Sequence, residues 1–288
     1  NEVGMMLDII VRNASIVDGS GEKMYGGDIG VKDGKFVSDV AGTGAAYEID
    51  ATGKLMTPGF IDSHSHMDAL LGKMDEVAAI AKINQGVTTE ITGQCGESRF
   101  PLVDTDEYFR EMKRIPKVGN YAFMCGHSAI REKVMQMNSS EPTKEQLQLM
   151  KDYVKRGMEN GAFGMTSGLI YVPGVYAKEE ELIELCKVIH DYDGIYATHM
   201  RSESDNIIPA VKEAIDVAEK ADTALVISHH KICGKQNWGS SKETLRLVHD
   251  AINRGMRITI DQYPYEASQT VLSTSIPPEY FTDGYDVL

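Results

Sequence analysis

Five side chains that can bind a metal ion follow apolar runs of this sequence. His64 and His66 stand two residues apart in PGFIDSHSHMD, Cys95 follows TTEITGQ, His199 follows IYAT, and His229 follows ALVIS. Side chains at positions i and i+2 of a strand project to one side, so His64 and His66 are expected to converge. Thiolate and imidazole ligands favour Zn²⁺, whereas Mg²⁺ and Ca²⁺ prefer oxygen. Because zinc with an open position activates water and polarises carbonyl groups, these residues predict hydrolysis at a carbonyl carbon.

Each of these residues also has a purely structural interpretation. A lone histidine at a strand end more often makes an ordinary hydrogen bond, and Cys95 alone would be a small buried hydrophobe. Their shared occurrence after several apolar runs favours a metal site. His230 is the weaker candidate of its pair with His229, because neighbours on a strand face opposite ways. His127 has no second donor beside it and is expected to position a loop instead.

The elements that must position these side chains change in kind near Pro58. Residues 1–57 contain short β-rich runs broken by DG, GG and TG turn signals, which predict a small β-domain. In residues 58–288, apolar runs alternate with amphipathic segments such as NIIPAVKEAIDVAEKA. This alternation predicts an α/β domain with a parallel sheet and a (β/α) barrel, seven of whose eight strands can be counted. The predicted strands end near His64, Cys95, His127, Met165, His199, His229 and Asp261.

The composition excludes several classes of partner. The formal net charge of −14 and the pI of about 5.0 argue against nucleic acids and anionic membranes, which attract basic surfaces. No apolar run approaches the roughly 20 residues of a membrane helix, and no cleavable leader is expected. Four cysteines without a CxxC pair indicate free thiols and therefore a cytoplasmic location. A small-molecule substrate is the expected partner, and the oligomeric state stays open.

Six segments together resemble the D-aminoacylase (N-acyl-D-amino-acid deacylase) branch of the amidohydrolase superfamily. They are PGFIDSHSHMD, GVTTEITGQCGES, GAFGMTSGLIYVPG, YATHMRSE, ISHHKICGKQNWG and DQYPYEAS, and the likeness runs from about Leu7 to Ser268. It implies a TIM-like (β/α)8 barrel flanked by a small β-sandwich, to which residues 1–57 contribute the N-terminal strands. The HxH motif is common to the superfamily, whereas its combination with TGQCG and SHHK is specific to a much smaller group of proteins.

The resemblance also implies a set of metal ligands. Many amidohydrolases bridge two metals with a carboxylated lysine on strand four, but AFGMTSGLI contains no lysine. In the deacylase branch a strand-two cysteine replaces it, which matches Cys95. One tightly bound Zn²⁺ would then lie on Cys95, His199 and His229, with His64 and His66 at a second, weaker position.

Four further residues match family positions around the substrate, namely Lys231, Tyr171, Tyr263 and Ser268. Lys231 could bind an anionic group of the substrate. The two tyrosines could donate hydrogen bonds to the substrate or pack on it. The alternatives are that Tyr171 and Tyr263 are only packing aromatics and that Lys231 is a solvated surface ammonium.

The family places its general acid/base aspartate at the end of strand eight, and nothing after Asp261 resembles that strand. Asp261, at the end of strand seven, is therefore the runner-up carboxylate for this role. We expect the 288 residues to be part of a longer protein that also supplies the remaining strands of the sandwich.

The function implied by the resemblance is zinc-dependent hydrolysis of the amide bond of N-acyl-D-amino acids by metal-activated water. The products would be a carboxylate and a free D-amino acid, and the chirality rests on the resemblance alone. One alternative is another amidohydrolase, acting on a cyclic amide, a cyclic imide or a dipeptide. The other is a non-catalytic scaffold, which the presence of all five candidate ligands disfavours.

Overall fold

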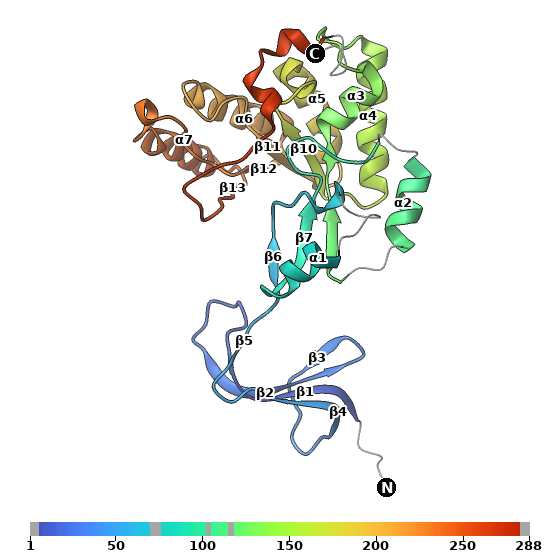
Figure 1. The fold of residues 1–288 in the computed structure, drawn as a ribbon, viewed down its shortest axis with the longest axis vertical. Coiled ribbons are helices and arrows are strands. Elements are labelled where there is room, and N and C mark those ends of the chain that lie inside the picture. The colour runs from blue at the N-terminus through green and yellow to red at the C-terminus, as the bar shows by residue number, and fades with distance from the viewer. Residues whose placement is uncertain (1–5, 70–75, 102–104, 115–117, 283–288) are drawn as a thin grey trace. The chain divides into compact units, whose positions relative to one another are not determined.

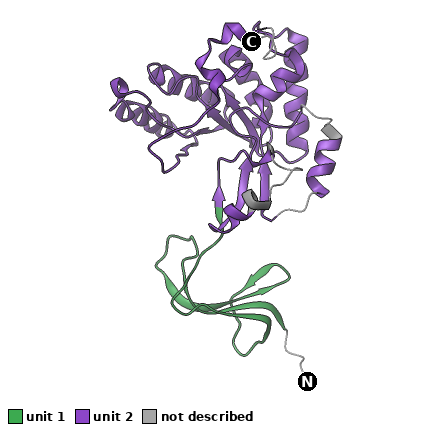
Figure 2. Ribbon diagram, viewed as in Figure 1, with its two compact units in different colours: residues 1–60 green, residues 61–288 purple. Residues whose placement is uncertain are grey.

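The computed structural model describes residues 6–69, 76–101, 105–114 and 118–282. The chain divides into two compact units, Asn1–Phe60 and Ile61–Leu288, which Figure 2 shows in different colours. Among these described residues, the buried apolar clusters of one unit contain no residue of the other. Each unit therefore has a core of its own, and the two are described separately.

One mixed β-sheet makes up the first unit. Its strands are β1 (Leu7–Ile16), β2 (Tyr25–Lys32), β3 (Lys35–Val37), β4 (Ala45–Asp50) and β5 (Leu55–Met56). The order is β3-β2-β1-β4, with β5 also paired to β1; β2 is antiparallel to β1 and β3, whereas β4 and β5 run parallel to β1. Asp33 and Gly34 connect β2 to β3 with φ values of 49° and 73°, and a two-residue hairpin turn of type I′ requires positive φ at both positions.

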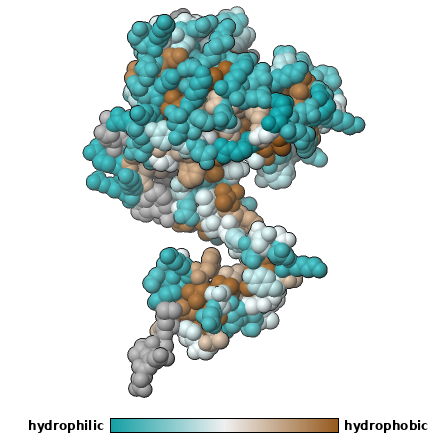
Figure 3. Space-filling view, turned by 180° about the vertical axis from the view of Figure 1, so that it is seen from behind, coloured by the Kyte–Doolittle hydropathy of each residue, from teal (hydrophilic) through white to brown (hydrophobic). Residues whose placement is uncertain are grey.

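The sheet of the first unit exposes apolar side chains. Phe36, Ile49 and Leu55 are 75%, 48% and 66% exposed, and apolar surface is visible on this unit in Figure 3. The described part of the unit contains a single sheet, so the β-sandwich stays a prediction.

Parallel strands form the centre of the second unit (Figure 1). They are β6 (Phe60–Asp62), β7 (Val87–Thr92), β8 (Asn120–Phe123), β9 (Cys125–Gly126), β10 (Gly164–Gly168), β11 (Ile195–His199), β12 (Ala224–Ile227) and β13 (Ile258–Ile260). One sheet has the order β6-β7-β8 and the other β13-β12-β11-β10-β9, and only Met124 separates β8 from β9. Among the described residues no pairing joins β13 to β6, so the closed barrel stays a prediction.

Helices alternate with these strands, and the predicted α/β architecture is confirmed. They are α1 (Glu76–Ile83), α2 (Thr105–Arg114), α3 (His127–Met135), α4 (Lys144–Glu159), α5 (Glu179–His190), α6 (Ile207–Ala221) and α7 (Ser241–Asn253). Helix α6 buries Ile207, Val211 and Ile215, which recur at the spacing of one helix face. Helix α4 begins at a capping box, in which the Thr143 and Gln146 side chains each accept from the other's backbone N–H.

Short 3₁₀ helices lie in several connections. They are η1 (Met67–Ala69), η2 (Gly174–Tyr176), η3 (Lys235–Asn237), η4 (Leu272–Ser275) and η5 (Pro278–Phe281). None of the helices in the part of the chain that the structure describes has the length and apolar character needed to cross a bilayer.

A buried charge network connects α3 to α5. Glu181 accepts hydrogen bonds from Nε2 of His127 at 2.7 Å and from the guanidinium of Arg131, which also donates to the backbone carbonyls of Asn138 and Ser140. The residues His127, Arg131 and Glu181 are at most 4% exposed. Burial alone would raise the pKa of Glu181, but the hydrogen bond from His127 and the charges of His127 and Arg131 lower it overall. The network therefore keeps an ionised carboxylate in the core.

Candidate metal centre

Histidine and cysteine side chains converge where the parallel strands of the second unit end. The Sγ atom of Cys95 lies 3.4 Å from Nε2 of His64, 3.7 Å from Nδ1 of His199 and 3.6 Å from Nε2 of His229. Two sets of residues have donor atoms within 4.8 Å of one another, namely His64, His66 and Cys95, and Cys95, His199 and His229. The structure thus brings all five candidate ligands together around one sulfur atom.

Backbone geometry after β7, β11 and β12 sets three of these positions. His199 is the last residue of β11, and His229 lies two residues beyond β12 with a φ of 36°. Cys95 lies three residues beyond β7 with a φ of 56°, and its carbonyl oxygen would be 2.1 Å from a Cβ added at Gly168. Positive φ costs free energy in residues other than glycine and is concentrated at functional sites. Cys95 and His229, both candidate ligands, are among the described non-glycine residues that adopt this unfavourable backbone conformation.

His64 and His66 reach the cluster from a loop and not from a strand. Strand β6 ends at Asp62, so the interpretation that side-chain alternation on a strand makes the two histidines converge is wrong. The loop nevertheless places their ring centroids 5.5 Å apart. The backbone N–H of His64 donates to Asp62, and Nδ1 of His64 lies 3.3 Å from a carboxylate oxygen of Asp261. Carboxylates on two sides therefore orient His64.

The spacing of the donor atoms fits a zinc ion. Zinc lies about 2.3 Å from thiolate sulfur and about 2.0 to 2.1 Å from imidazole nitrogen, and in a tetrahedron these lengths separate sulfur from nitrogen by about 3.6 Å. The sulfur of Cys95 lies at 3.7 and 3.6 Å from the facing nitrogens of His199 and His229. These two separations are therefore those expected of one thiolate and two imidazoles around a zinc ion.

Two imidazoles of the cluster, those of His199 and His66, are held in the neutral form that binds metals. Burial lowers the pKa of His199 to about 3, since the opposing effect of Glu203 is smaller and His229 lowers the pKa further. Desolvation, followed by the neighbouring His64 and His229, lowers the pKa of His66 to about 4. Both rings are thus unprotonated and free to donate a lone pair at neutral pH.

The surroundings of Cys95 disfavour a thiolate unless a positive charge lies beside it. Burial raises the pKa of the Cys95 thiol, and the nearby carboxylates of Glu97, Asp261 and Glu203 raise it further. A divalent cation beside the sulfur reverses this balance, because a coordinating thiol is deprotonated. The thiol, the neutral imidazoles and the surrounding carboxylates together fit a bound zinc ion.

Glu203 is a functional candidate that reasoning from the sequence missed. One of its oxygens accepts from Nδ1 of His229 at 2.8 Å and from the ammonium of Lys231, and it lies 3.9 Å from Nε2 of His199. Burial alone would raise the pKa of Glu203, but the hydrogen bond from His229 leads the effects that lower it to about 2. A carboxylate on the far nitrogen fixes the tautomer of a ligand histidine. Its only signal in the sequence is its place four residues after His199.

We expect the substitution Glu203→Gln to weaken zinc binding by about 10- to 100-fold, the usual effect of losing a carboxylate that orients a ligand histidine. Zinc affinity is measured on the full-length protein by competition with a chromophoric chelator. The substitution Glu141→Gln removes an exposed carboxylate elsewhere and should leave the affinity unchanged. If both variants retained the original affinity, Glu203 would have no role in holding His229 for the metal.

Lys231 is not the solvated surface ammonium that was one alternative for it. Its side chain is 15% exposed, and its ammonium contacts Glu203 and lies 3.0 Å from Nδ1 of His229. The same ammonium lies 5.5 Å from the centre of the Tyr263 ring. Lys231 is therefore part of the polar cluster next to the candidate ligands.

The other predicted substrate residues differ in how near they lie to the cluster. The hydroxyl of Tyr171 is 3.3 Å from Nδ1 of His199 and 2.9 Å from Oγ1 of Thr270, so this tyrosine faces the cluster. The hydroxyl of Tyr263 is buried without a hydrogen-bond partner among the described residues. Ser268 is exposed, and the structure describes no hydrogen bond of its hydroxyl. Tyr171 has the most direct link to the candidate metal centre.

The remaining histidines and cysteines of interest lie outside the cluster. Nε2 of His230 is 3.0 Å from Oγ1 of Thr244, so this ring is engaged with the start of α7. His127 belongs to the buried network with Glu181. Cys125 and Cys186 are free and fully buried, as expected of small hydrophobic residues.

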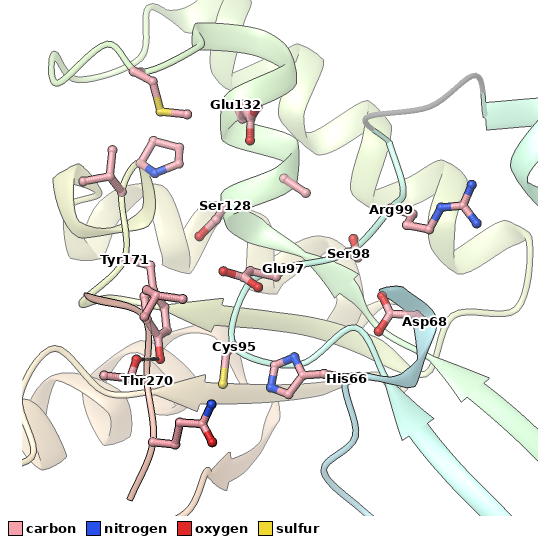
Figure 4. Close-up of a pocket in the computed structure, with 16 residues that line it drawn as sticks. His66, Asp68, Cys95, Glu97, Ser98, Arg99, Ser128, Glu132, Tyr171 and Thr270 are labelled. Carbon is pink, nitrogen blue, oxygen red and sulfur yellow. Dashed lines mark hydrogen bonds between the residues drawn. The ribbon is translucent and has the colours of Figure 1, made fainter. Parts of the chain in front are cut away.

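A pocket of about 870 Å³ lies beside the candidate ligands (Figure 4). His66, Cys95 and Tyr171 line its end at the metal centre, and the loop after β7 and the first turns of α3 line the part beyond them. A pocket of this volume suits a small molecule with one end at the metal.

Parallel strands with a cysteine–histidine cluster at their carboxyl ends define an α/β protein with a candidate metal centre. A model of the amidohydrolase family matches residues 47–284. The chain therefore belongs to the amidohydrolase family.

Known relatives show which branch the chain resembles. It is 34% identical to D-aminoacylase from Alcaligenes xylosoxydans xylosoxydans in an alignment that covers 92% of this chain and 59% of that protein. The structure of N-acyl-D-glutamate deacylase from Bordetella bronchiseptica, complexed with zinc and a phosphonate mimic of the tetrahedral intermediate, superposes with a TM-score of 0.86. That likeness has 32% identity and covers 91% of this chain and 59% of the other.

A structure of D-aminoacylase, solved to study its binuclear metal centre, gives a TM-score of 0.83 at 35% identity. It too is matched over 90% of this chain and 59% of its own length. The resemblance to the D-aminoacylase branch that the motifs predict is thus confirmed. The chain spans about three fifths of the length of these relatives.

Proposed function

We propose that the full-length protein is a zinc-dependent hydrolase that cleaves the amide bond of N-acyl-D-amino acids to a carboxylate and a free D-amino acid. The observation that carries the proposal is the set of sulfur–nitrogen separations of 3.6 and 3.7 Å between Cys95 and two histidines. Relatives of the amidohydrolase family that are named D-aminoacylase and N-acyl-D-glutamate deacylase support the substrate class.

The proposed ligands of a tight zinc site are Cys95, His199 and His229, and His64 and His66 are proposed for a second, weaker site. Each set includes Cys95, so this residue would contribute to both proposed sites. Bound zinc supplies a Lewis acid for the amide carbonyl and lowers the pKa of water. The occurrence of zinc in one related structure and of a binuclear centre in another supports this assignment.

The polar residues around the ligands are proposed to bind and orient the substrate. Tyr171 is a hydrogen-bond donor at neutral pH, because burial raises the pKa of its hydroxyl to about 12. At 3.3 Å from Nδ1 of His199 this hydroxyl is near enough to donate to the oxygen of an amide under attack. Lys231 and Tyr263 are proposed to bind the substrate carboxylate, for which Lys231 would exchange part of its contact with Glu203. Ser268 is proposed for the same region on family resemblance alone.

Asp261 is proposed to orient ligands and not to act as the general base. Burial alone would raise the pKa of Asp261, but its contacts with His64 and the backbone of His229 lower it overall. A carboxylate whose pKa is lowered is a weaker proton acceptor, whereas a general base works best with a pKa near the working pH. The base is therefore proposed to be the strand-eight aspartate that the resemblance implies.

The finer architecture and location also belong to this proposal. The open edges of the described sheets in the second unit support a closed (β/α)8 barrel in the full-length protein. The exposed Ile49 and Leu55 of the first unit support a second β-layer that would complete a sandwich. Four cysteines without a disulfide support a reducing, cytoplasmic location.

A substrate panel tests the proposed function. The full-length, zinc-loaded protein is assayed with N-acetyl-D-amino acids, their L-enantiomers, hydantoins and dipeptides. We expect free D-amino acids to be released and the L-enantiomers to react at least about 100-fold more slowly, as a loss of about 2.7 kcal/mol of transition-state binding requires. Hydrolysis of hydantoins or dipeptides alone would contradict the proposal and favour another amidohydrolase activity. If none of these substrates were hydrolysed, a non-catalytic scaffold role would be favoured instead.

A further inference from the structure

The pocket beside the candidate ligands has a strongly acidic far end, which we call the side pocket and define by Glu97, Ser128 and Glu132. Glu97 lies on the loop after β7, and Ser128 and Glu132 lie one turn apart on α3. Residues four apart on a helix share one face, so Ser128 and Glu132 point the same way. Figure 4 shows Glu97, Ser128 and Glu132 one after another along the pocket above Cys95.

Neither carboxylate of the side pocket has a cationic partner among the residues that the structure describes. No ion pair or side-chain hydrogen bond involves Glu97 or Glu132 there. Arg99 also lines the pocket, but its guanidinium extends away from Glu97 and lies 3.8 Å from Glu111. Burial raises the pKa of Glu132, and no neighbouring positive charge that the structure describes opposes this effect. A bound cation would supply such a charge.

Ser128 provides an independent indication of a ligand. The residue is 5% exposed, and its Oγ atom is buried without a hydrogen-bond partner in the described ranges. A Cβ added at Gly96 or Gly174 would come within 2.7 or 2.6 Å of this oxygen, so the backbones of these two glycines lie close to the hydroxyl. Buried hydroxyls are normally satisfied, and one that faces an open pocket without a partner can accept from a ligand.

We propose that the side pocket binds an ammonium or guanidinium group of the substrate through Glu97, Glu132 and Ser128. The inference rests on the proposed function and specifies its substrate class, N-acyl-D-amino acids with a cationic end. An ammonium has three N–H donors, and the side pocket offers three acceptor groups. Val172, Pro173 and Met137 line the same pocket and would cover the methylene stem of such a group.

The cation could belong to the amino-acid side chain or to the acyl group, and two matched pairs of substrates separate these sources. N-acetyl-D-lysine and N-acetyl-D-norleucine differ by the side-chain ammonium, and N-(6-aminohexanoyl)-D-norleucine and N-hexanoyl-D-norleucine differ by the acyl ammonium. In one pair we expect kcat/KM to be about 10-fold or more higher for the cationic member, as a hydrogen-bonded charge provides. Absence of a preference in both pairs would overturn the proposal.

Substitutions at Glu132 test whether this preference arises in the side pocket. The substitution Glu132→Gln is expected to remove most of the preference for the cationic substrate, and Glu132→Lys to favour an anionic side chain such as that of N-acetyl-D-2-aminoadipate. The substitution Glu141→Gln removes an exposed carboxylate elsewhere and is expected to retain the full preference. A preference that persists in both Glu132 variants would contradict the assignment.

Product binding separates failure of this inference from failure of the proposed function. Free D-lysine and D-norleucine, and 6-aminohexanoate and hexanoate, are titrated calorimetrically into the full-length holoenzyme, which does not turn them over. We expect the cationic member of one pair to bind about 10-fold more tightly. If this held while no N-acyl-D-amino acid was cleaved, the proposed function would fail and the side pocket would stand. If N-acyl-D-amino acids were cleaved but no cationic ligand were preferred, the proposed function would stand and the proposal for the side pocket would fail.

Discussion

Replacing Cys95 with serine is expected to remove zinc from the full-length protein and to lower kcat/KM for N-acyl-D-amino acids by more than about 100-fold. Both sets of candidate ligands contain this sulfur, so one substitution removes a ligand from each. A serine hydroxyl is a poor replacement, because it remains protonated and lies closer to the backbone than a thiolate. Loss of a residue that binds the metal directly should lower zinc affinity and activity by more than the 10- to 100-fold known for residues that only orient the ligands.

The control for this experiment is Cys186→Ser, which makes the same chemical change on the buried face of α5. Zinc content is measured by mass spectrometry on folded, gel-filtered protein, so loss of stability in either variant does not affect the comparison. We expect the Cys186 variant to retain its zinc. Equal zinc content and equal activity in both variants would show that Cys95 is not a ligand.

Replacing Glu181 with glutamine is expected to destabilise the second unit by about 3 to 5 kcal/mol. The substitution leaves the buried guanidinium of Arg131 without its counter-charge, and breaking one partner out of a buried pair has an effect of this size. Unfolding in urea, followed by circular dichroism, measures the change. The exposed neighbour Glu180 supplies the matched control, since Glu180→Gln should change stability by no more than about 0.5 kcal/mol.

The pH dependence of this effect follows from the lowered pKa of Glu181. The folded protein holds the carboxylate ionised at pH values where the unfolded chain, with a pKa of about 4.3, already binds a proton. The carboxylate therefore contributes its full stability above about pH 5, and this contribution is lost as the pH falls through the folded-state pKa. We expect the difference between the original protein and Glu181→Gln to shrink in acid. A difference that grew on acidification would show that the pKa of Glu181 is raised and not lowered.

The positions of the candidate ligands follow largely from sequence periodicity. Parallel strands place their carboxyl ends at one edge, so Cys95, His199 and His229, each at or just after the end of an apolar run, were expected to meet there. The structure places their donor atoms within 4.8 Å of one another. The prediction for His64 and His66 had the correct outcome for the wrong reason, because a loop after β6 brings them together.

Residues whose positions depend on loops and on distant packing could not be found in this way. Glu203 lies in the segment between β11 and α6, and its contact with His229 depends on how that segment packs against the loop after β12. The side pocket combines Glu97 from one loop with Glu132 from a helix that begins 30 residues later in the chain. No periodic pattern links such residues, and in the sequence each of these glutamates is indistinguishable from an ordinary surface residue.

A thiolate from Cys95 is expected to bind zinc together with imidazoles. X-ray absorption at the zinc edge tests this directly on the full-length protein. The spectrum reports the atoms around zinc without requiring activity or a substituted protein. We expect one sulfur neighbour at about 2.3 Å, with nitrogen or oxygen neighbours at about 2.0 to 2.1 Å. A first shell that contains nitrogen and oxygen but no sulfur would contradict it.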